Sequence, residues 1–177
     1  GGSVLIRNII PKHMDCITAK LVEMGIAIEE QGDSIRVTRQ HDIQRTNIKT
    51  MPYPGFPTDV QPQLMAALCL AKGTSVIKES IFESRFQHVA ELRKMGAAIE
   101  IQGNTAVING VPALYGASVQ GTDLRAGAAL VLAGLAAEGE TRVYGLHHIL
   151  RGYENFDRAL QGLGAKVSVA EEDESSL

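Results

Sequence analysis

The sequence has few cysteines and few aromatic residues, which argues against a disulfide-rich secreted class. Of its 177 residues, two are Cys, none is Trp and 5% are aromatic. Cys16 and Cys69 both lie in helical patterns beside apolar neighbours, where a free thiol usually behaves as a small core residue. This use of cysteine favours a reducing, cytoplasmic location.

An excess of basic charge is also absent, and so is any long apolar segment. Lys and Arg total 17 against 20 Asp and Glu, which gives a net charge of −3 and no electrostatic footprint for nucleic acid. The longest apolar stretch, Ala126 to Ala137, is interrupted by Gly127 and Gly134 and is too short to cross a bilayer. We expect no nucleic-acid partner, no membrane span and no signal peptide.

Two further absences concern bound groups. The five histidines show no metal-ligand spacing with one another or with Cys. Neither a Gly-x-Gly-x-x-Gly fingerprint nor a Walker phosphate loop is present. We therefore expect no metal and no cofactor, and the sequence does not support a nucleotide-hydrolysing or dinucleotide-binding site.

What the sequence does contain is a repeat. Thr58-Asp59 and Thr122-Asp123, 64 positions apart, each precede an apolar run, a Gly, a β-like stretch, an Arg-bearing segment and an amphipathic helix. These helices and a similar one near the start of the chain end at Gly25, Gly96 and Gly164, which are spaced by 71 and 68 positions. A period of this length indicates a duplicated small fold rather than an open solenoid. The first copy contains only the second half of the unit.

The alternation of helix and strand signals predicts an α/β (α+β) layered domain. Apolar residues make up 45% of the chain, enough for a sizeable core. The helices after the Thr-Asp pairs, near Leu64 to Ala71 and Ala126 to Ala137, have no polar residue on any face and should be buried on all sides. The helices near residues 12–24, 86–95 and 154–163 carry one apolar stripe each and should lie outside. A strand or a strand pair should close each unit.

One domain is expected over residues 1–177. Gly32-Asp33 and Gly103-Asn104 lie between β-like runs and predict hairpin turns. A polar, Pro-rich connector runs from Arg39 to Pro57. The expected divisions are a half repeat with this connector, a second repeat, a third repeat and a fraying acidic tail, at residues 1–57, 58–121, 122–170 and 171–177.

The Thr-Asp pairs have a structural and a functional interpretation. At a helix start their side-chain oxygens can accept backbone N–H bonds as ordinary N-caps. Alternatively, Asp59 and Asp123 meet at one rim of the domain, where the buried helices converge, together with Arg85, Arg125 and Arg151. Such a group suits an anionic substrate, because Arg binds phosphate and carboxylate through charge-assisted bonds and an ionised Asp can take a proton from a hydroxyl.

The structural alternative for each Arg is a surface ion pair, such as Arg151 with Glu154. His147 and His148 precede Arg151 and could line the same rim, although such a pair is more often a polar patch at a strand end. Tyr153 could pack beneath Arg151.

Around these residues the chain resembles the enolpyruvyl transferase family. Four stretches carry the resemblance, in order and at consistent spacing: Pro52 to Gln63, Ile81 to Phe86, Thr122 to Ala126 and Arg151 to Glu154. They read PYPGFPTDVQPQ, IFESRF, TDLRA and RGYE. The resemblance covers nearly the whole chain, but only the later part of the enzyme.

The resemblance implies a fold and a reaction. The family builds each of two domains from three β-α-β-α-β-β units, with helices inside and strands outside, as an inside-out barrel. It moves an enolpyruvyl group from phosphoenolpyruvate to an acceptor hydroxyl through a tetrahedral intermediate and releases phosphate. The stretches Ile81 to Phe86 and Arg151 to Glu154 favour the branch that uses UDP-N-acetylglucosamine, in the first committed step of peptidoglycan synthesis.

The same resemblance assigns roles to individual residues. Asp59 matches the base at the sugar hydroxyl, and Asp123 matches the second catalytic carboxylate. Asp59, Ile81 through its backbone, and Phe82 match contacts to the UDP-sugar. The basic residues on the phosphoenolpyruvate side are matched by Arg85, Arg125 and Arg151.

The family's reactive Cys loop and its Lys-Asn phosphate-binding residues belong to a part of the enzyme that the resemblance does not cover. Neither Cys16 nor Cys69 is expected to replace that Cys. We therefore expect a piece of a longer enzyme that needs the N-terminal domain as its partner, with no transferase activity of its own. Two alternatives stay open: the branch of the family that uses shikimate 3-phosphate, and a non-catalytic paralogue.

Overall fold

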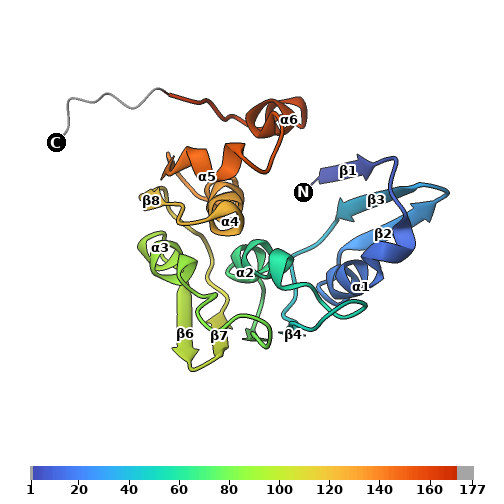
Figure 1. Cartoon of the computed structure of the whole chain (residues 1–177), viewed down its shortest axis with the longest axis horizontal. Helices are drawn as coiled ribbons and strands as arrows, with labels where there is room; N and C mark the ends of the chain where they lie inside the picture. The colour runs from blue at the N-terminus through green and yellow to red at the C-terminus, as the bar shows by residue number, and fades with distance from the viewer. Residues whose placement is uncertain (1, 171–177) are drawn as a thin grey trace.

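The computed structural model describes residues 2–170, which form three successive groups of helices and strands (Figure 1). The predicted acidic tail, residues 171–177, lies outside the described residues. Within residues 2–170 the strands make three small sheets, of three, four and two strands. The chain is thus a mixed α/β domain, which confirms the predicted class.

The first group is an antiparallel sheet with one helix. Its elements are β1 (Gly2–Ile6), α1 (Asp15–Glu23), β2 (Ala27–Gln31) and β3 (Ser34–Arg39), and β3 lies between the other two strands. The predicted turn at Gly32-Asp33 joins β2 to β3. The helix expected over residues 12–24 begins with a 3-10 turn at Pro11–Met14 and continues as α1. Gly25 follows its C-cap with a φ of 79°, which suits glycine.

The second group has the element order β-α-β-α-β-β. Its elements are β4 (Asn47–Lys49), α2 (Gln61–Leu68), β5 (Thr74–Lys78), α3 (His88–Lys94), β6 (Ala98–Gln102) and β7 (Thr105–Asn109). The strands lie in the order β4-β5-β7-β6, with β4 parallel to β5 and the predicted turn at Gly103-Asn104 between β6 and β7. Strand β4 falls within the stretch predicted as a connector. Only Ile48 of its three residues is buried. The polar residues on either side of it interrupt the apolar pattern from which a strand is predicted.

The third group starts like the second and ends differently. Its elements are β8 (Ser118–Gln120), α4 (Leu124–Ala136), β9 (Arg142–Tyr144), α5 (Leu146–Leu150) and α6 (Phe156–Gly162), and β8 is parallel to β9. The prediction that strands close each unit is wrong here, because no strand follows α6 as far as residue 170. The apolar stripe predicted for α6 is not buried either. The third group has no closing sheet to cover this helix, and Leu163 is exposed.

The interior is built around the two helices that follow the Thr-Asp pairs. Helices α2 and α4 pack side by side in the middle of the molecule (Figure 1). Six of the eight residues of α2 are buried, as predicted. The prediction is wrong for one face of α4, where Leu132 and Leu135 are 39% and 40% exposed. The neighbours α2, α3, α5 and β9 cover only the other faces of that helix.

Residues 2–170 contain neither a membrane-spanning helix nor a metal-binding cluster. No helix there is both long and apolar enough to span a membrane. No group of three or more His, Cys, Asp or Glu side chains in this range is placed to hold a metal ion.

Candidate functional site

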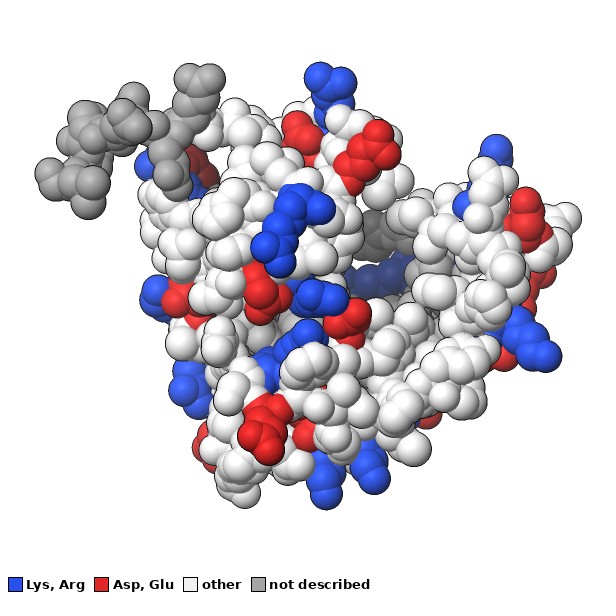
Figure 2. Space-filling view, in the orientation of Figure 1, with Lys and Arg blue, Asp and Glu red and all other residues white. Residues whose placement is uncertain are grey.

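The starts of α2 and α4 lie side by side, so the two Thr-Asp pairs come together. Asp59 lies in a 3-10 turn, Thr58–Val60, directly before α2, and Asp123 directly precedes α4. Arg125, in the first turn of α4, reaches across to Asp59, and Arg85 reaches the same carboxylate. The structure thus brings together four of the five predicted charged side chains. On the face shown in Figure 2, acidic and basic side chains alternate.

Asp59 is held by two arginines. Arg125 donates from Nε to Oδ1 at 2.9 Å and from Nη2 to Oδ2 at 3.1 Å, which is a bidentate pair. Arg85 donates from Nη1 to Oδ1 at 3.3 Å. The hydrogen bonds that Arg125 donates to Asp59 raise the pKa of its guanidinium, which stays cationic. The N-cap interpretation is wrong for Asp59, whose side chain accepts no backbone bond at the start of α2.

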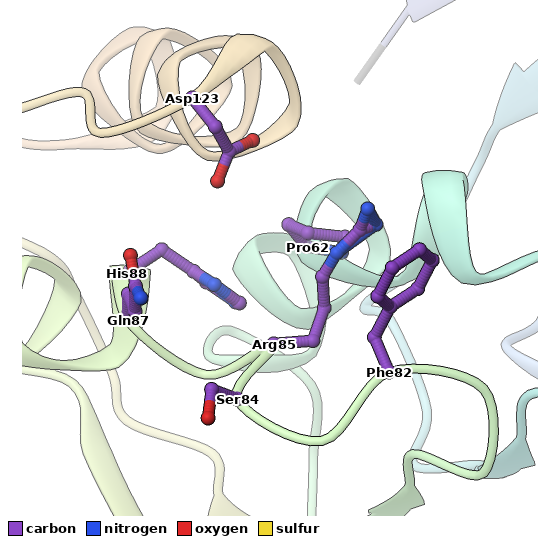
Figure 3. A pocket seen from close by; sticks show the side chains of 7 residues that line it. All are labelled: Pro62, Phe82, Ser84, Arg85, Gln87, His88 and Asp123. Carbon is purple, nitrogen blue, oxygen red and sulfur yellow. The ribbon is translucent and has the colours of Figure 1, made fainter.

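Asp123, in contrast, caps its helix. Its Oδ1 accepts the backbone N–H of Arg125 at 2.7 Å and that of Ala126 at 3.0 Å. These bonds satisfy two of the N–H groups that a helix start leaves without partners. Both bonds end on the same oxygen. The other carboxylate oxygen can therefore contact a ligand in the cavity that Asp123 lines (Figure 3).

A cavity of about 170 Å³ lies beside the starts of α2, α3 and α4 (Figure 3). Its lining consists of Pro62, Phe82, Ser84, Arg85, Gln87, His88 and Asp123. The guanidinium of Arg85 lies over the Phe82 ring, with Cζ 4.6 Å from the ring centre, and the Arg85 side chain is only 14% exposed. Pockets for drug-sized ligands typically measure about 300–1,000 Å³. This cavity therefore matches a small anion rather than a whole nucleotide sugar.

The loop that carries Ile81 and Phe82 is anchored by Glu79, a residue that the sequence pattern did not single out. Glu79 directly follows β5 and is 2% exposed. It accepts the backbone N–H of Ile81 at 2.9 Å and that of Phe82 at 3.2 Å. The N–H of Ile81 is thus already used within the chain, which leaves its carbonyl as the backbone group for a ligand. The side chains of Ile81 and Phe82 are exposed.

His88 is a second residue that the sequence analysis missed. It is 2% exposed, and it lines the cavity together with Arg85 and Asp123. Its Nε2 has no hydrogen-bond partner among residues 2–170. Burial lowers the pKa of His88 to about 4, while Asp123 raises it by a smaller amount and Arg85 lowers it further, so the imidazole is neutral at pH 7. One feature of the sequence points to His88. It is a polar residue four positions before Leu92, so it lies on the apolar stripe of the predicted helix.

The burial of His88 predicts a loss of stability in mild acid. The unfolded chain takes up this proton near the ordinary pKa of 6.5, and the folded chain only near 4. Stability is therefore complete above pH 6.5 and falls as the pH drops through this window. Between pH 7 and pH 5 the free energy of unfolding should fall by about 2 kcal/mol, measured by urea unfolding.

Two variants test the assignment. The free energy of unfolding of His88→Asn should fall less over that interval, whereas that of His41→Asn, at an exposed site, should fall as in the wild type. Equal pH dependence in all three proteins would contradict the assignment.

Arg151 lies near the group without joining it. It follows α5, and a Cβ on the next residue, Gly152, would come within 2.6 Å of Leu124 in the first turn of α4. The loop with Arg151 therefore packs against the start of α4. No ion pair among residues 2–170 includes Arg151, so the predicted surface pair with Glu154 is not formed.

Two ring pairs near Arg151 are formed locally. Tyr153 stacks on Phe156, with ring centres 4.9 Å apart. The rings of His147 and His148 lie 4.0 Å apart and are tilted by 40°. Neither pair belongs to the residues that line the cavity.

The chain matches known proteins over nearly its whole length. Residues 1–160 match the family model of EPSP synthase (3-phosphoshikimate 1-carboxyvinyltransferase). A UDP-N-acetylglucosamine 1-carboxyvinyltransferase of Clostridium botulinum is 56% identical over 167 residues, which cover 94% of this chain and 40% of that protein. A UDP-N-acetylglucosamine 1-carboxyvinyltransferase of Desulfofundulus thermocisternus is 51% identical over 175 residues, which cover 99% of this chain and 72% of that protein.

Solved structures share the fold. The enolpyruvyl transferase NikO from Streptomyces tendae superposes with a TM-score of 0.79 at 29% identity, over 86% of this chain and 36% of NikO. EPSP synthase from Acinetobacter baumannii superposes with a TM-score of 0.71, over 96% of this chain and 40% of that enzyme. Its identity of 20% supports a shared fold alone.

The extent of these matches defines the family. The family model covers most of the chain, and the relative from D. thermocisternus is matched over more than two thirds of its own length. Against the C. botulinum protein the chain spans about 40% of the length. The chain belongs to the EPSP synthase family of enolpyruvyl transferases, within the group of UDP-N-acetylglucosamine 1-carboxyvinyltransferases.

Proposed function

We propose that this chain is part of an enzyme that transfers enolpyruvate from phosphoenolpyruvate to UDP-N-acetylglucosamine and releases phosphate, the first committed step of peptidoglycan synthesis. One observation carries the proposal. The central helices α2 and α4 begin side by side, and there Asp59 lies between Arg85 and Arg125. A possible proton acceptor thus lies beside groups that bind anions, which is the combination that this transfer needs.

Asp59 acts as the general base at the sugar hydroxyl. Its Oδ1 accepts bonds from both arginines, whereas Oδ2 accepts only the bond from Arg125. An ionised carboxylate oxygen can accept more than one hydrogen bond, so Oδ2 can still receive a substrate hydroxyl. The side chain is 55% exposed, which leaves it accessible to that hydroxyl.

Phosphoenolpyruvate binds on the side of Arg85, Arg125 and Arg151. The cavity beside Arg85 has the volume of a small anion, and Arg85 is the cationic side chain that lines it. The helix start at Asp123 brings a partial positive charge to the same place. Asp123 is the second catalytic carboxylate, with the oxygen that is not used in capping directed at the reacting group.

The UDP-sugar lies along the exposed loop of Ile81 and Phe82, next to Asp59. This loop presents two apolar side chains and the carbonyl of Ile81. Such a surface can cover a sugar or a base while Asp59 contacts the reacting hydroxyl. The 170 Å³ cavity alone is too small for this substrate, which supports a site completed by another part of the enzyme.

The proposal includes the organisation of the chain. Residues 1–57, 58–121 and 122–170 are the half repeat with its connector and two further repeats of one domain, arranged with helices inside and strands outside. The central position of α2 supports this arrangement. Strands β4 and β8 fall just before the second and third divisions and pair with β5 and β9 inside them. The partner is the N-terminal domain of the same enzyme, the location is cytoplasmic, and this chain alone has no measurable transferase activity.

A reconstitution assay tests the function. This chain is mixed with the remaining part of a UDP-N-acetylglucosamine 1-carboxyvinyltransferase, and phosphate release from phosphoenolpyruvate is followed with each acceptor in turn. We expect release with UDP-N-acetylglucosamine, none with shikimate 3-phosphate, and none from either part alone. Turnover by this chain alone, or release with shikimate 3-phosphate only, would overturn the proposal.

The two thiols give a separate prediction, because neither should serve as the family's reactive Cys. Burial raises the pKa of Cys69 to about 12, and its Sγ donates to the carbonyl of Met65. At pH 8 its thiolate population should be on the order of 10³-fold below that of an ordinary thiol.

In the folded chain, a thiol reagent should label Cys16, which is partly exposed, and should leave Cys69 unmodified until urea is added. Mass spectrometry of the wild type and of Cys16→Ser distinguishes the two sites. Rapid labelling of Cys69 in folded Cys16→Ser would refute this prediction.

A further inference from the structure

Glu79 is a buried acid without an ionic partner. It is 2% exposed, and no salt bridge among residues 2–170 includes it. A carboxylate in such a place is strongly destabilising unless hydrogen bonds replace its hydration. The chain supplies these bonds from donors in three separate segments.

Four donors surround the two carboxylate oxygens. Oε1 accepts the Thr50 hydroxyl at 2.6 Å and the backbone N–H groups of Ile81 and Phe82 at 2.9 and 3.2 Å. Oε2 accepts the Thr58 hydroxyl at 3.0 Å. Thr50 is itself fully buried and accepts the backbone N–H of Ser80 at 2.8 Å through its hydroxyl. Hydrogen bonds to an ionised acceptor are stronger than neutral ones, so this network fixes its members tightly.

The network joins the segments that carry the candidate substrate contacts. Thr58 directly precedes Asp59, and the two anchored amides belong to the loop of Ile81 and Phe82. Thr50 follows β4 and pairs with the end of β5 through its own backbone N–H. One carboxylate therefore sets the spacing between the Asp59 turn and the Ile81 loop. Removing it leaves one buried and three partly buried donors without their acceptor, and the two segments lose their common support.

We propose that Glu79 is the positioning residue for the UDP-sugar side of this site. Its carboxylate does not touch substrate, because it is enclosed by its own donors. It holds the turn that contains Asp59 and the loop of Ile81 and Phe82 at the spacing that lets one ligand contact both. The identity of that ligand rests on the function proposed above, whereas the coupling of the two segments does not.

The first test needs no substrate. Amide hydrogen exchange is measured by NMR in this chain for the wild type, Glu79→Ala, Glu79→Gln and Glu83→Ala. In Glu79→Ala the amides of Ile81 and Phe82 should exchange faster by about tenfold or more, while the amide of Ile77 in β5 stays slow. Gln keeps an acceptor for these amides and should restore most of the protection. Glu83, exposed in the same loop, serves as the matched control.

The second test uses the assembled transferase. Glu79→Ala should raise KM for UDP-N-acetylglucosamine by about tenfold and leave KM for phosphoenolpyruvate nearly unchanged, with rescue by Glu79→Gln. A general loss of folding would instead affect both substrates and the exchange of Ile77. If Glu79→Ala does not fold, Thr50→Val, which removes one donor at nearly constant volume, replaces it in both tests.

The outcomes separate this inference from the proposed function. Wild-type protection of Ile81 and Phe82 in a folded Glu79→Ala or Thr50→Val variant overturns the inference, and so does an equal rise in both KM values. A wild-type enzyme that does not bind UDP-N-acetylglucosamine overturns the proposed function. In that case the exchange data alone decide whether Glu79 couples the two segments.

Discussion

Asp59→Asn in the assembled transferase should lower kcat by about 10²- to 10⁴-fold, the range that a positioned general base contributes. Asn keeps the shape of the side chain and can still accept one bond from Arg125, but it cannot take a proton from the sugar hydroxyl. The main loss should therefore be in kcat, with a smaller change in KM for UDP-N-acetylglucosamine. Phosphate release measured over a range of both substrates gives these constants.

A loss of activity through unfolding can be distinguished from this effect. Asp59 is 55% exposed, and ion pairs at such positions contribute at most about 1 kcal/mol to stability. The melting temperature of Asp59→Asn should therefore change little. Asp33→Asn, on the exposed turn between β2 and β3, removes the same charge at a site remote from Arg125 and should keep full activity. A folded Asp59→Asn enzyme with wild-type kcat would show that the base is another group.

The meeting of the Thr-Asp pairs was accessible to sequence reasoning because it depends on repetition. Equivalent positions of a duplicated unit occupy equivalent places, and an apolar helix must pack in the interior. Two such helices with matched starts therefore converge at one rim. The resemblance to a known family added roles for the residues, which periodicity alone does not assign.

The different behaviour of the two aspartates has a cause in the sequence. Asp123 binds the N–H groups two and three positions ahead, the second of which belongs to Ala126. Three positions after Asp59 the chain has Pro62, which carries no N–H. The same motif therefore loses one capping bond at Asp59, and its carboxylate binds Arg85 and Arg125 instead.

Glu79 could not be identified from local pattern, since its surroundings come from distant segments. The hydroxyls that bind Glu79 lie 29 and 21 positions earlier in the chain. The exposed face of α4 has a related explanation. The apolar character of Leu132 and Leu135 predicts that something should cover them, but it does not specify which part of a protein does so.

Gly110→Ala should destabilise the fold by about 3 kcal/mol or more, the largest stability effect expected from a single added methyl group in this chain. A Cβ at Gly110 would lie 1.6 Å from the carbonyl oxygen of Ala71 and 2.8 Å from its carbonyl carbon. Both are backbone atoms, so no side-chain rotation relieves the overlap. The melting temperature should fall by roughly 6–12 °C for a domain of this size, or the variant should fail to fold.

The close approach at Gly110 fixes one end of the helix whose other end adjoins Asp59. Gly110 donates its N–H to Gly73, and Val111 donates to the carbonyl of Cys69, so the exit of β7 is bonded to the end of α2. Gly162→Ala is the matched control: no atom lies within 4 Å of its added Cβ, and in α6 it should be neutral or stabilise by up to about 1 kcal/mol. If Gly110→Ala keeps wild-type stability, the backbone of β7 lies farther from the end of α2 than in this structure. The position of Asp59 would then depend on the arginines and on the network around Glu79 rather than on a rigid helix beneath it.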